Sequence, residues 1–142
     1  MNEVFIDASY WVALIFARDV NNLQSVNQWR EIQSRNWGIL TTNWTLYEAI
    51  TILNGRRVRR HDLAVNLLNI AQDSSVIADA SDYEQQALEI FRSHADKRWS
   101  VVDCANFVCI REPHSAMALS FDRDFAQAQA EFGFAVLGAG AS

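Results

Sequence analysis

Residues 3–19, EVFIDASYWVALIFARD, decide the fold class, because two kinds of periodicity follow one another with no linker between them. Residues 3–7 form a short apolar run rich in β-formers that ends at Asp7, which is the pattern of a strand. The apolar residues of 9–19 then fall near one helical face, and Ser9 is placed to serve as the N-cap. This segment therefore predicts a strand that leads directly into a helix.

The same alternation continues along the rest of the chain. Strand candidates are residues 3–7, 37–42, 74–81, 115–121 and 134–138. Helix candidates are residues 9–19, 21–35, 42–55, 59–73, 81–96, 100–112 and 124–133. The helix at 42–55 has Gly55 as a natural C-cap, and the one at 81–96 opens with the capping-box pattern of Ser81 and Glu84. Alternating strands and helices predict an α/β fold with a mostly parallel central sheet of about five strands, covered by helices on both faces.

Length and composition indicate one folded domain spanning residues 1–142. Half of the residues are hydrophobic and a fifth are charged, as in ordinary globular proteins. The formal net charge of −5 argues against a general nucleic-acid coat, but not against an enzyme whose metal ions carry the positive charge. The N-terminus lacks the basic region of a signal peptide, and its apolar run is too short to cross a bilayer. Cys104 and Cys109 match no common zinc spacing, so we expect reduced packing residues in a cytoplasmic protein without membrane attachment.

Acidic residues follow two of the predicted strands. Asp7 ends the first strand, and Asp122 and Asp124 come directly after the fourth. Sites in open parallel sheets form beyond the carboxyl ends of the strands, so these side chains are predicted at one edge of the sheet. Taken singly, an aspartate at a strand end is more often a simple turn residue.

Two further acids lie on predicted helices. Asp103 stands in a first helical turn, three residues after the N-cap candidate Ser100, where a carboxylate can simply serve the helix dipole. Glu48 lies outside the apolar stripe of its helix, where an acid is usually solvated. Taken together with the strand-end acids, these positions favour a cation, because carboxylates at one edge repel each other unless a cation neutralises them. Oxygen ligands without histidine suit Mg²⁺ or Mn²⁺ rather than zinc.

Four segments around these acids resemble, in order and spacing, the acidic motifs of PIN-domain ribonucleases, and within them those of the VapC toxins of type II toxin–antitoxin systems. The segments are VFIDASYWVAL (4–14), TTNWTLYEAITIL (41–53), WSVVDCANFVCIRE (99–112) and ALSFDRDF (118–125). The resemblance covers nearly the whole chain and implies a three-layer α/β/α PIN-like domain. It also implies divalent-metal-dependent hydrolysis of RNA phosphodiester bonds, a VapB-like antitoxin as partner and a homodimer.

The resemblance implies roles for individual residues. The acidic quartet would be Asp7, Glu48, Asp103 and Asp122. Asp7, Asp103 and Asp122 would bind Mg²⁺ or Mn²⁺, while Glu48 would bind a second ion or orient the attacking water. Ser100 and Ser120 stand at the Ser/Thr positions before the third and fourth acids, and the resemblance implies that they contact the substrate. Asp124 is the second choice for the fourth acid, or an outer metal ligand.

A basic segment follows the second motif. Residues 55–62, GRRVRRHD, hold four arginines in an otherwise acidic chain: Arg56, Arg57, Arg59 and Arg60. Guanidinium groups bind phosphate, so this segment is the clearest candidate for RNA backbone contact. A solvated helix junction and an antitoxin contact remain open readings of the same residues.

Two other phosphate-handling families fit poorly. A haloacid-dehalogenase-type phosphatase needs a second acid two residues after the first, where Ser9 stands, and a response-regulator receiver needs an early acidic pair. The serious alternative is a non-catalytic PIN-like module that binds RNA or a protein. The sequence leaves open which RNA is cut and where, whether one or two ions bind, whether Asp122 or Asp124 is the fourth acid, and which antitoxin binds.

Overall fold

The central sheet has five parallel strands in the order β3-β2-β1-β4-β5. The structure is a computed structural model that describes residues 2–111 and 117–138. The strands are β1 (Glu3–Ile6), β2 (Gly38–Thr42), β3 (Val76–Ala78), β4 (Met117–Ser120) and β5 (Ala135–Gly138). The predicted α/β class and the mostly parallel sheet of five strands are confirmed.

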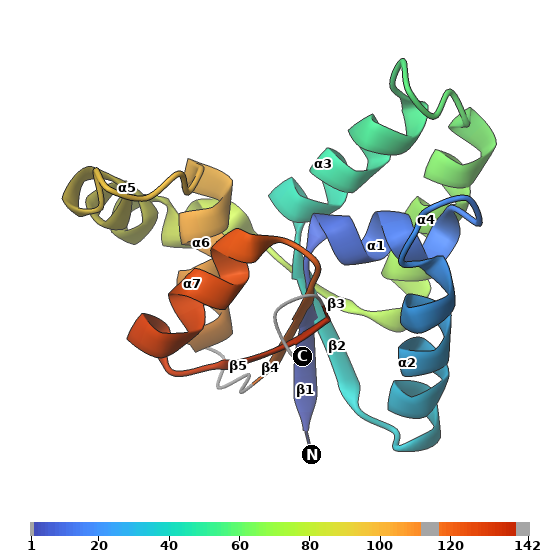
Figure 1. Cartoon of the computed structure of the whole chain (residues 1–142), viewed down its shortest axis with the longest axis horizontal. Coiled ribbons are helices and arrows are strands. Elements are labelled where there is room, and N and C mark those ends of the chain that lie inside the picture. Colours follow the sequence, from blue (N-terminus) through green and yellow to red (C-terminus); the bar gives the residue numbers. More distant parts are fainter. Residues whose placement is uncertain (1, 112–116, 139–142) are drawn as a thin grey trace.

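Helices cover both faces of this sheet (Figure 1). Within the described ranges they are α1 (Ala8–Ile15), α2 (Asn22–Ser34), α3 (Asn43–Asn54), α4 (His61–Ser74), α5 (Glu84–Ser93), α6 (Val101–Arg111) and α7 (Arg123–Phe132), with a 3₁₀ turn at Ala80–Tyr83. One apolar core lies between the sheet and α1–α4, and a second lies between the sheet and α5–α7. The predicted three-layer α/β/α architecture is confirmed.

The central strand explains why the sequence pattern was so clear. Val4, Phe5 and Ile6 are all fully buried. Val4 and Ile6 belong to the core beneath α1–α4, whereas Phe5 belongs to the core beneath α5–α7. A strand covered on both faces needs apolar residues at consecutive positions, so it reads as an uninterrupted hydrophobic run.

The order of the strands reverses direction between β1 and β4. From β1 the chain builds outward to β2 and β3 on one side, and β4 and β5 are then added on the other side. The backbone N–H of Asp7 donates to the carbonyl of Leu119 at 3.0 Å, which ties the end of β1 to β4. Such a reversal opens a crevice at the carboxyl ends of the strands, where α/β proteins bind their ligands.

The predicted helix ends are partly corrected. Helix α1 starts at Ala8 with Asp7 in the N-cap position, so the prediction that Ser9 is the N-cap is wrong. The predicted capping box is also wrong, because Asp79 accepts from the backbone N–H of Ser81 and caps the 3₁₀ turn that precedes α5. Gly55 does end α3, with extended backbone. A Cβ there would lie 2.9 Å from the carbonyl oxygen of Thr51, which explains the absence of a side chain.

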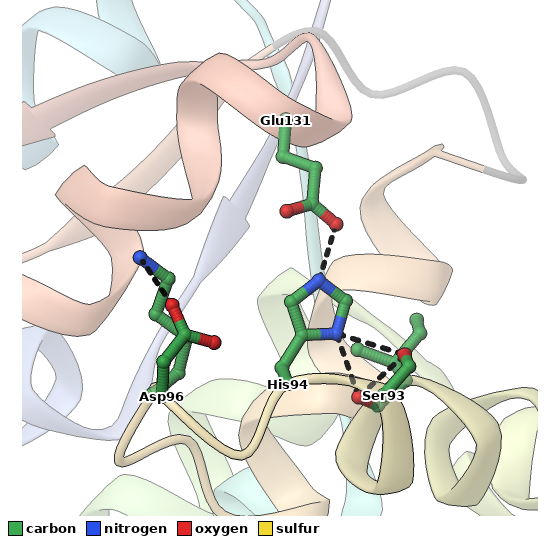
Figure 2. A network of polar contacts seen from close by, with 6 residues as sticks. Ser93, His94, Asp96 and Glu131 are labelled. Atoms are coloured by element: carbon green, nitrogen blue, oxygen red, sulfur yellow. Dashed lines mark hydrogen bonds and ion pairs between the residues drawn. The ribbon is translucent and has the colours of Figure 1, made fainter.

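A histidine joins the end of α5 to α7 (Figure 2). His94 Nε2 lies 2.7 Å from Glu131 Oε2, and His94 Nδ1 lies 2.7 Å from the carbonyl oxygen of Ile90. The ring also packs against Trp99, whose side chain is buried. We call His94, Glu131 and the Ile90 carbonyl the His94 cluster. Of the other two histidines, His61 is exposed and His114 lies outside the described residues.

The two cysteines are buried and unpaired, as expected of packing residues. No helix in residues 2–111 and 117–138 is both long and apolar enough to cross a membrane.

Candidate active site

Five carboxylates from four elements gather at the crevice between β1 and β4. Asp7 directly follows β1 and Asp122 is the N-cap of α7, two residues after β4. Asp103 and Asp124 lie in the first turns of α6 and α7, and Glu48 lies in the second turn of α3. The charge of Asp122 raises the pKa of each of the other four, so Asp122 lies within electrostatic reach of all of them. We call this group the acidic centre.

Asp7 is the most deeply placed member. Only 5% of its surface is exposed. Its Oδ2 accepts hydrogen bonds from the hydroxyls of Ser120 at 2.9 Å and Ser9 at 3.2 Å. Burial raises the pKa of Asp7 to about 7; hydrogen bonds from Ser120 and the Ala8 backbone oppose this rise, and the charges of Asp103 and Asp122 add to it. Without a cation, this carboxyl therefore takes up a proton at a much higher pH than an exposed aspartate does.

Asp103 is fixed by its own helix end. The backbone N–H of Asp103 donates to Ser100 Oγ at 3.0 Å, and the backbone N–H of Ser100 donates to Asp103 Oδ2 at 2.9 Å. This reciprocal cap confirms Ser100 as the N-cap of α6. Burial raises the pKa of Asp103 to about 6, against the Ser100 hydrogen bonds and with added repulsion from Asp122 and Asp124.

Asp122, Asp124 and Glu48 complete the centre. Asp122 Oδ1 accepts from the backbone N–H of Asp124 at 2.9 Å, which caps α7. Partial burial and the charge of Asp122 raise the pKa of Asp124, and Arg98 opposes this shift. Glu48 lies on the exposed face of α3. Partial burial of its carboxyl group raises the pKa of Glu48, and the negative charge of Asp122 raises it further.

The donor set suits a hard divalent cation. In the part of the chain that the structure describes, no lysine, arginine or histidine forms an ion pair with any of the five carboxylates. Within the same residues, no three acidic, histidine or cysteine side chains converge tightly enough to form a ready-made metal cage. Mg²⁺ keeps several waters and uses few carboxylates, so separated oxygen ligands around an uncompensated negative charge fit a hydrated ion.

The predicted serines and arginines occupy different places. Ser120 Oγ donates to Asp7 and accepts from the backbone N–H of Asp122 at 3.0 Å, so it lies inside the acidic centre. The arginine segment connects α3 to α4 and begins at the end of α3, about 10 Å of helix rise beyond Glu48. Arg60 there forms two 2.9 Å hydrogen bonds with Asp62. The arginines are thus separate from the centre, and their contact with RNA stays a prediction.

The sequence predictions missed two groups that support the centre. Ser9 Oγ accepts from the backbone N–H of Phe121 at 3.0 Å, a contact between residues 112 positions apart. Asn106 of α6 accepts from the hydroxyl of Thr45 at 2.7 Å, and so joins the helix of Asp103 to the helix of Glu48. A hydroxyl two residues after Asp7 was visible in the sequence, but its partner was not, because local patterns carry no information on distant backbone groups.

Comparison with known proteins identifies a family for this arrangement. The family model described as PIN domain matches residues 4–131. Two curated relatives, both named 23S rRNA-specific endonuclease VapC20, come from Mycobacterium tuberculosis strains H37Rv and CDC 1551 / Oshkosh. Each is 30% identical over 125 residues, covering 88% of this chain and 93% of the relative. The crystal structure of Mycobacterium tuberculosis VapC20, titled a Sarcin-Ricin loop cleaving toxin, matches with a TM-score of 0.78 and 30% identity, over 88% of this chain and 94% of that one.

Proposed function

The chain belongs to the PIN-domain family and is homologous to the VapC20 toxin endonuclease, and from that premise we propose that it is a divalent-metal-dependent ribonuclease. It is the toxin of a VapBC-type toxin–antitoxin pair and acts in the cytoplasm. One observation carries the proposal: five carboxylates from four elements repel one another at the switch point of the sheet, with no ion pair to a basic side chain in the described residues. Such a cluster favours cation binding.

Asp7, Asp103 and Asp122 hold the Mg²⁺ or Mn²⁺ ion in this proposal. A bound divalent ion supplies a more acidic water and neutralises the phosphate that this water attacks. Asp7 must release its proton before it can serve as a ligand, and burial makes that proton unusually well held. Asp122 is favoured over Asp124 as the fourth acid, because its charge raises the pKa of Asp7, Glu48 and Asp103, whereas that of Asp124 raises only the pKa of Asp103. Glu48, on the open side of the centre, orients the attacking water or binds a second ion.

Ribosomal RNA is the substrate class that we propose to test first. Both curated relatives are named for cleavage of 23S rRNA. The exposed arginine segment at 56–60 lies at the far end of α3 from the centre, where it would contact the backbone of a large folded RNA. Ser100 and Ser120 lie next to the metal ligands, so substrate contacts there would be made beside the scissile phosphate.

A VapB-like antitoxin and a second copy of the toxin complete the proposal. Exposed apolar side chains on α2, α3 and α4 support partner surfaces, since burying them would remove apolar area from water. They include Leu23, Tyr47, Ile52 and Val65.

The test is cleavage of 23S rRNA by the purified protein with Mg²⁺, Mn²⁺ or EDTA. We expect discrete cuts that need the metal and disappear in Asp103→Asn. Asp73→Asn, the same chemical change at an exposed position of α4, is the matched control and should cleave like the wild type. Equal cleavage by Asp103→Asn and Asp73→Asn would contradict the assigned centre. Binding of RNA without any cleavage would favour the alternative, a non-catalytic PIN-like module.

A further inference from the structure

Ser9 bridges the two strand ends that carry the acidic centre. Its hydroxyl donates to Asp7 Oδ2 at 3.2 Å and accepts from the backbone N–H of Phe121 at 3.0 Å. Ser9 lies in the first turn of α1, whereas Phe121 belongs to the turn between β4 and α7. The Ser9 side chain therefore links the Asp7 carboxylate to the turn that leads to Asp122.

Ser120 makes the parallel set of contacts from the other strand. Its hydroxyl donates to the same Asp7 oxygen at 2.9 Å and accepts from the backbone N–H of Asp122 at 3.0 Å. The hydroxyls of Ser9 and Ser120 lie 3.4 Å apart. Each hydroxyl has one proton to donate, so both can serve Oδ2 while both accept from neighbouring backbone N–H groups. The two serines form a matched pair around one carboxylate oxygen.

Asp7 is free for this arrangement because it does not cap its own helix. It occupies the N-cap position of α1, where an aspartate side chain usually accepts from the backbone N–H of the second or third helical residue, yet it forms no such cap and its backbone donor is Ala8 instead. The hydroxyls hold Oδ2 instead. With Oδ2 held by two hydroxyls, a bound ion would take the other oxygen, Oδ1.

We propose that Ser9 is a positioning residue of the metal site: with Ser120 it clamps Oδ2 of Asp7 and the turn carrying Asp122, so that the two carboxylates keep the separation that a bound ion needs. This inference rests on the proposed metal-dependent cleavage and adds a residue to it. Groups that orient metal ligands in this way typically change metal affinity or activity by about 10- to 100-fold when removed.

A purely structural role for Ser9 makes a different prediction. Alanine has a higher helix propensity than serine, so Ser9→Ala should cost little in the helix itself. If Ser9 only filled space in α1, the variant would cleave RNA and bind metal like the wild type. A positioning residue instead changes metal binding and turnover while leaving the KM for RNA unchanged, because it contacts a metal ligand and not the substrate.

The experiment compares Ser9→Ala with Ser9→Thr and with Ser34→Ala. Threonine keeps the hydroxyl, and Ser34 bonds only within its own helix α2, far from the acids along the chain. Three quantities are measured: the Mn²⁺ concentration giving half-maximal cleavage of 23S rRNA, kcat and KM at saturating Mn²⁺, and the shift of Tm that Mn²⁺ produces without RNA. In Ser9→Ala we expect the half-maximal Mn²⁺ concentration to rise about 10-fold, with lower kcat, unchanged KM and a reduced Tm shift. Ser9→Thr and Ser34→Ala should stay near wild type.

The outcomes separate this inference from the proposed function. A wild type that cleaves and is stabilised by Mn²⁺, with Ser9→Ala indistinguishable from it, overturns the positioning role alone. A wild type that shows neither cleavage nor Mn²⁺ stabilisation overturns the proposed function, and the positioning role with it. Should Ser9→Ala fail to fold, Ser9→Cys keeps the volume with weaker hydrogen bonds and should show the same loss.

Discussion

The acidic centre and the His94 cluster both join distant elements through polar groups, but only the His94 cluster neutralises its own charge. Its two ring nitrogens each face an acceptor, Glu131 on α7 and the Ile90 carbonyl on α5 (Figure 2). In the acidic centre, Asp122 repels the four other carboxylates and the described residues supply no ion-paired cation. The comparison teaches that one cluster is complete as folded, whereas the other becomes complete only when a cation binds.

The protonation of His94 follows from this geometry. The Ile90 carbonyl can only accept, so Nδ1 carries a proton, and protonation of Nε2 lets the ring donate to Glu131 as well; the ring also caps the C-terminal end of α5, where a positive charge is favourable. The Ile90 carbonyl raises the pKa of His94, and Glu131 and Asp96 raise it further against partial burial. A charged histidine paired with Glu131 therefore stabilises the contact between α5 and α7.

The largest expected effect separates activity from stability. Asp7→Asn should lower cleavage by about a thousandfold, because it removes a metal ligand, while the free energy of unfolding stays the same or rises as repulsion is relieved. Glu131→Gln should do the opposite, with near-normal cleavage and lower stability. Cleavage assays and urea unfolding of both variants make the measurement. If Glu131→Gln lost cleavage, or if Asp7→Asn cleaved like the wild type, the contrast between the two clusters would be wrong.

The second effect is a pH dependence of the metal-free protein. Folding raises the pKa of Asp7 from its ordinary value of 3.8 to about 7, so between these pH values the folded state binds more protons than the unfolded state. Stability should therefore fall as pH rises from about 4 to 7, by about 2–4 kcal/mol from this one group. Urea unfolding in EDTA at pH 5 and pH 8 measures it. Asp7→Asn should flatten this part of the profile, and Mn²⁺ at pH 8 should restore stability to the wild type only.

The third effect belongs to His94 and has the same sign. Because folding raises the pKa of His94 above its ordinary value of 6.5, the stabilisation is fully present below pH 6.5 and is lost as pH rises through the folded pKa. His94→Gln should cost about 1 kcal/mol at pH 5.5 and less at pH 8.5. The difference between wild type and variant should be the same with and without Mn²⁺. A difference that Mn²⁺ removed would mean that the His94 cluster and the acidic centre are coupled.

The smallest effect concerns the arginine segment, which belongs to neither cluster. The double change Arg56→Ala with Arg57→Ala should raise the KM for 23S rRNA by roughly two- to fivefold. The metal concentration that gives half-maximal cleavage should stay the same. Stability should stay within about 0.5 kcal/mol, since both side chains are exposed. The double change Arg30→Ala with Arg35→Ala, in α2 and at its C-cap, is the control, because it also removes two exposed positive charges. An unchanged KM together with weaker antitoxin binding would favour the antitoxin contact instead.

Much of the architecture was predictable because its signals are local. Val4, Phe5 and Ile6 are buried from both sides and so form a continuous apolar run, while α3 and α6 follow helical spacing. The strand-end positions of Asp7 and Asp122 were predictable for the same reason. The errors at Ser9 and Ser81 have different causes: the Ser9 hydroxyl bonds to Asp7 and Phe121 instead of capping α1, and Asp79 caps the 3₁₀ turn ahead of Ser81.

The sequence by itself determined the order of the elements and the positions of the acids along the chain, since periodicity and turn chemistry act over a few residues. Only the tertiary structure decided which acids meet. The strand order places β4 beside β1, although more than a hundred residues separate Asp7 from Asp122, and that pairing brings Ser9 and Ser120 to the same carboxylate oxygen. The partners of His94 were decided in the same way, because Glu131 lies 37 residues further on. Neighbouring strands and facing helices are selected by the packing of whole layers, a property that no local pattern of residues records.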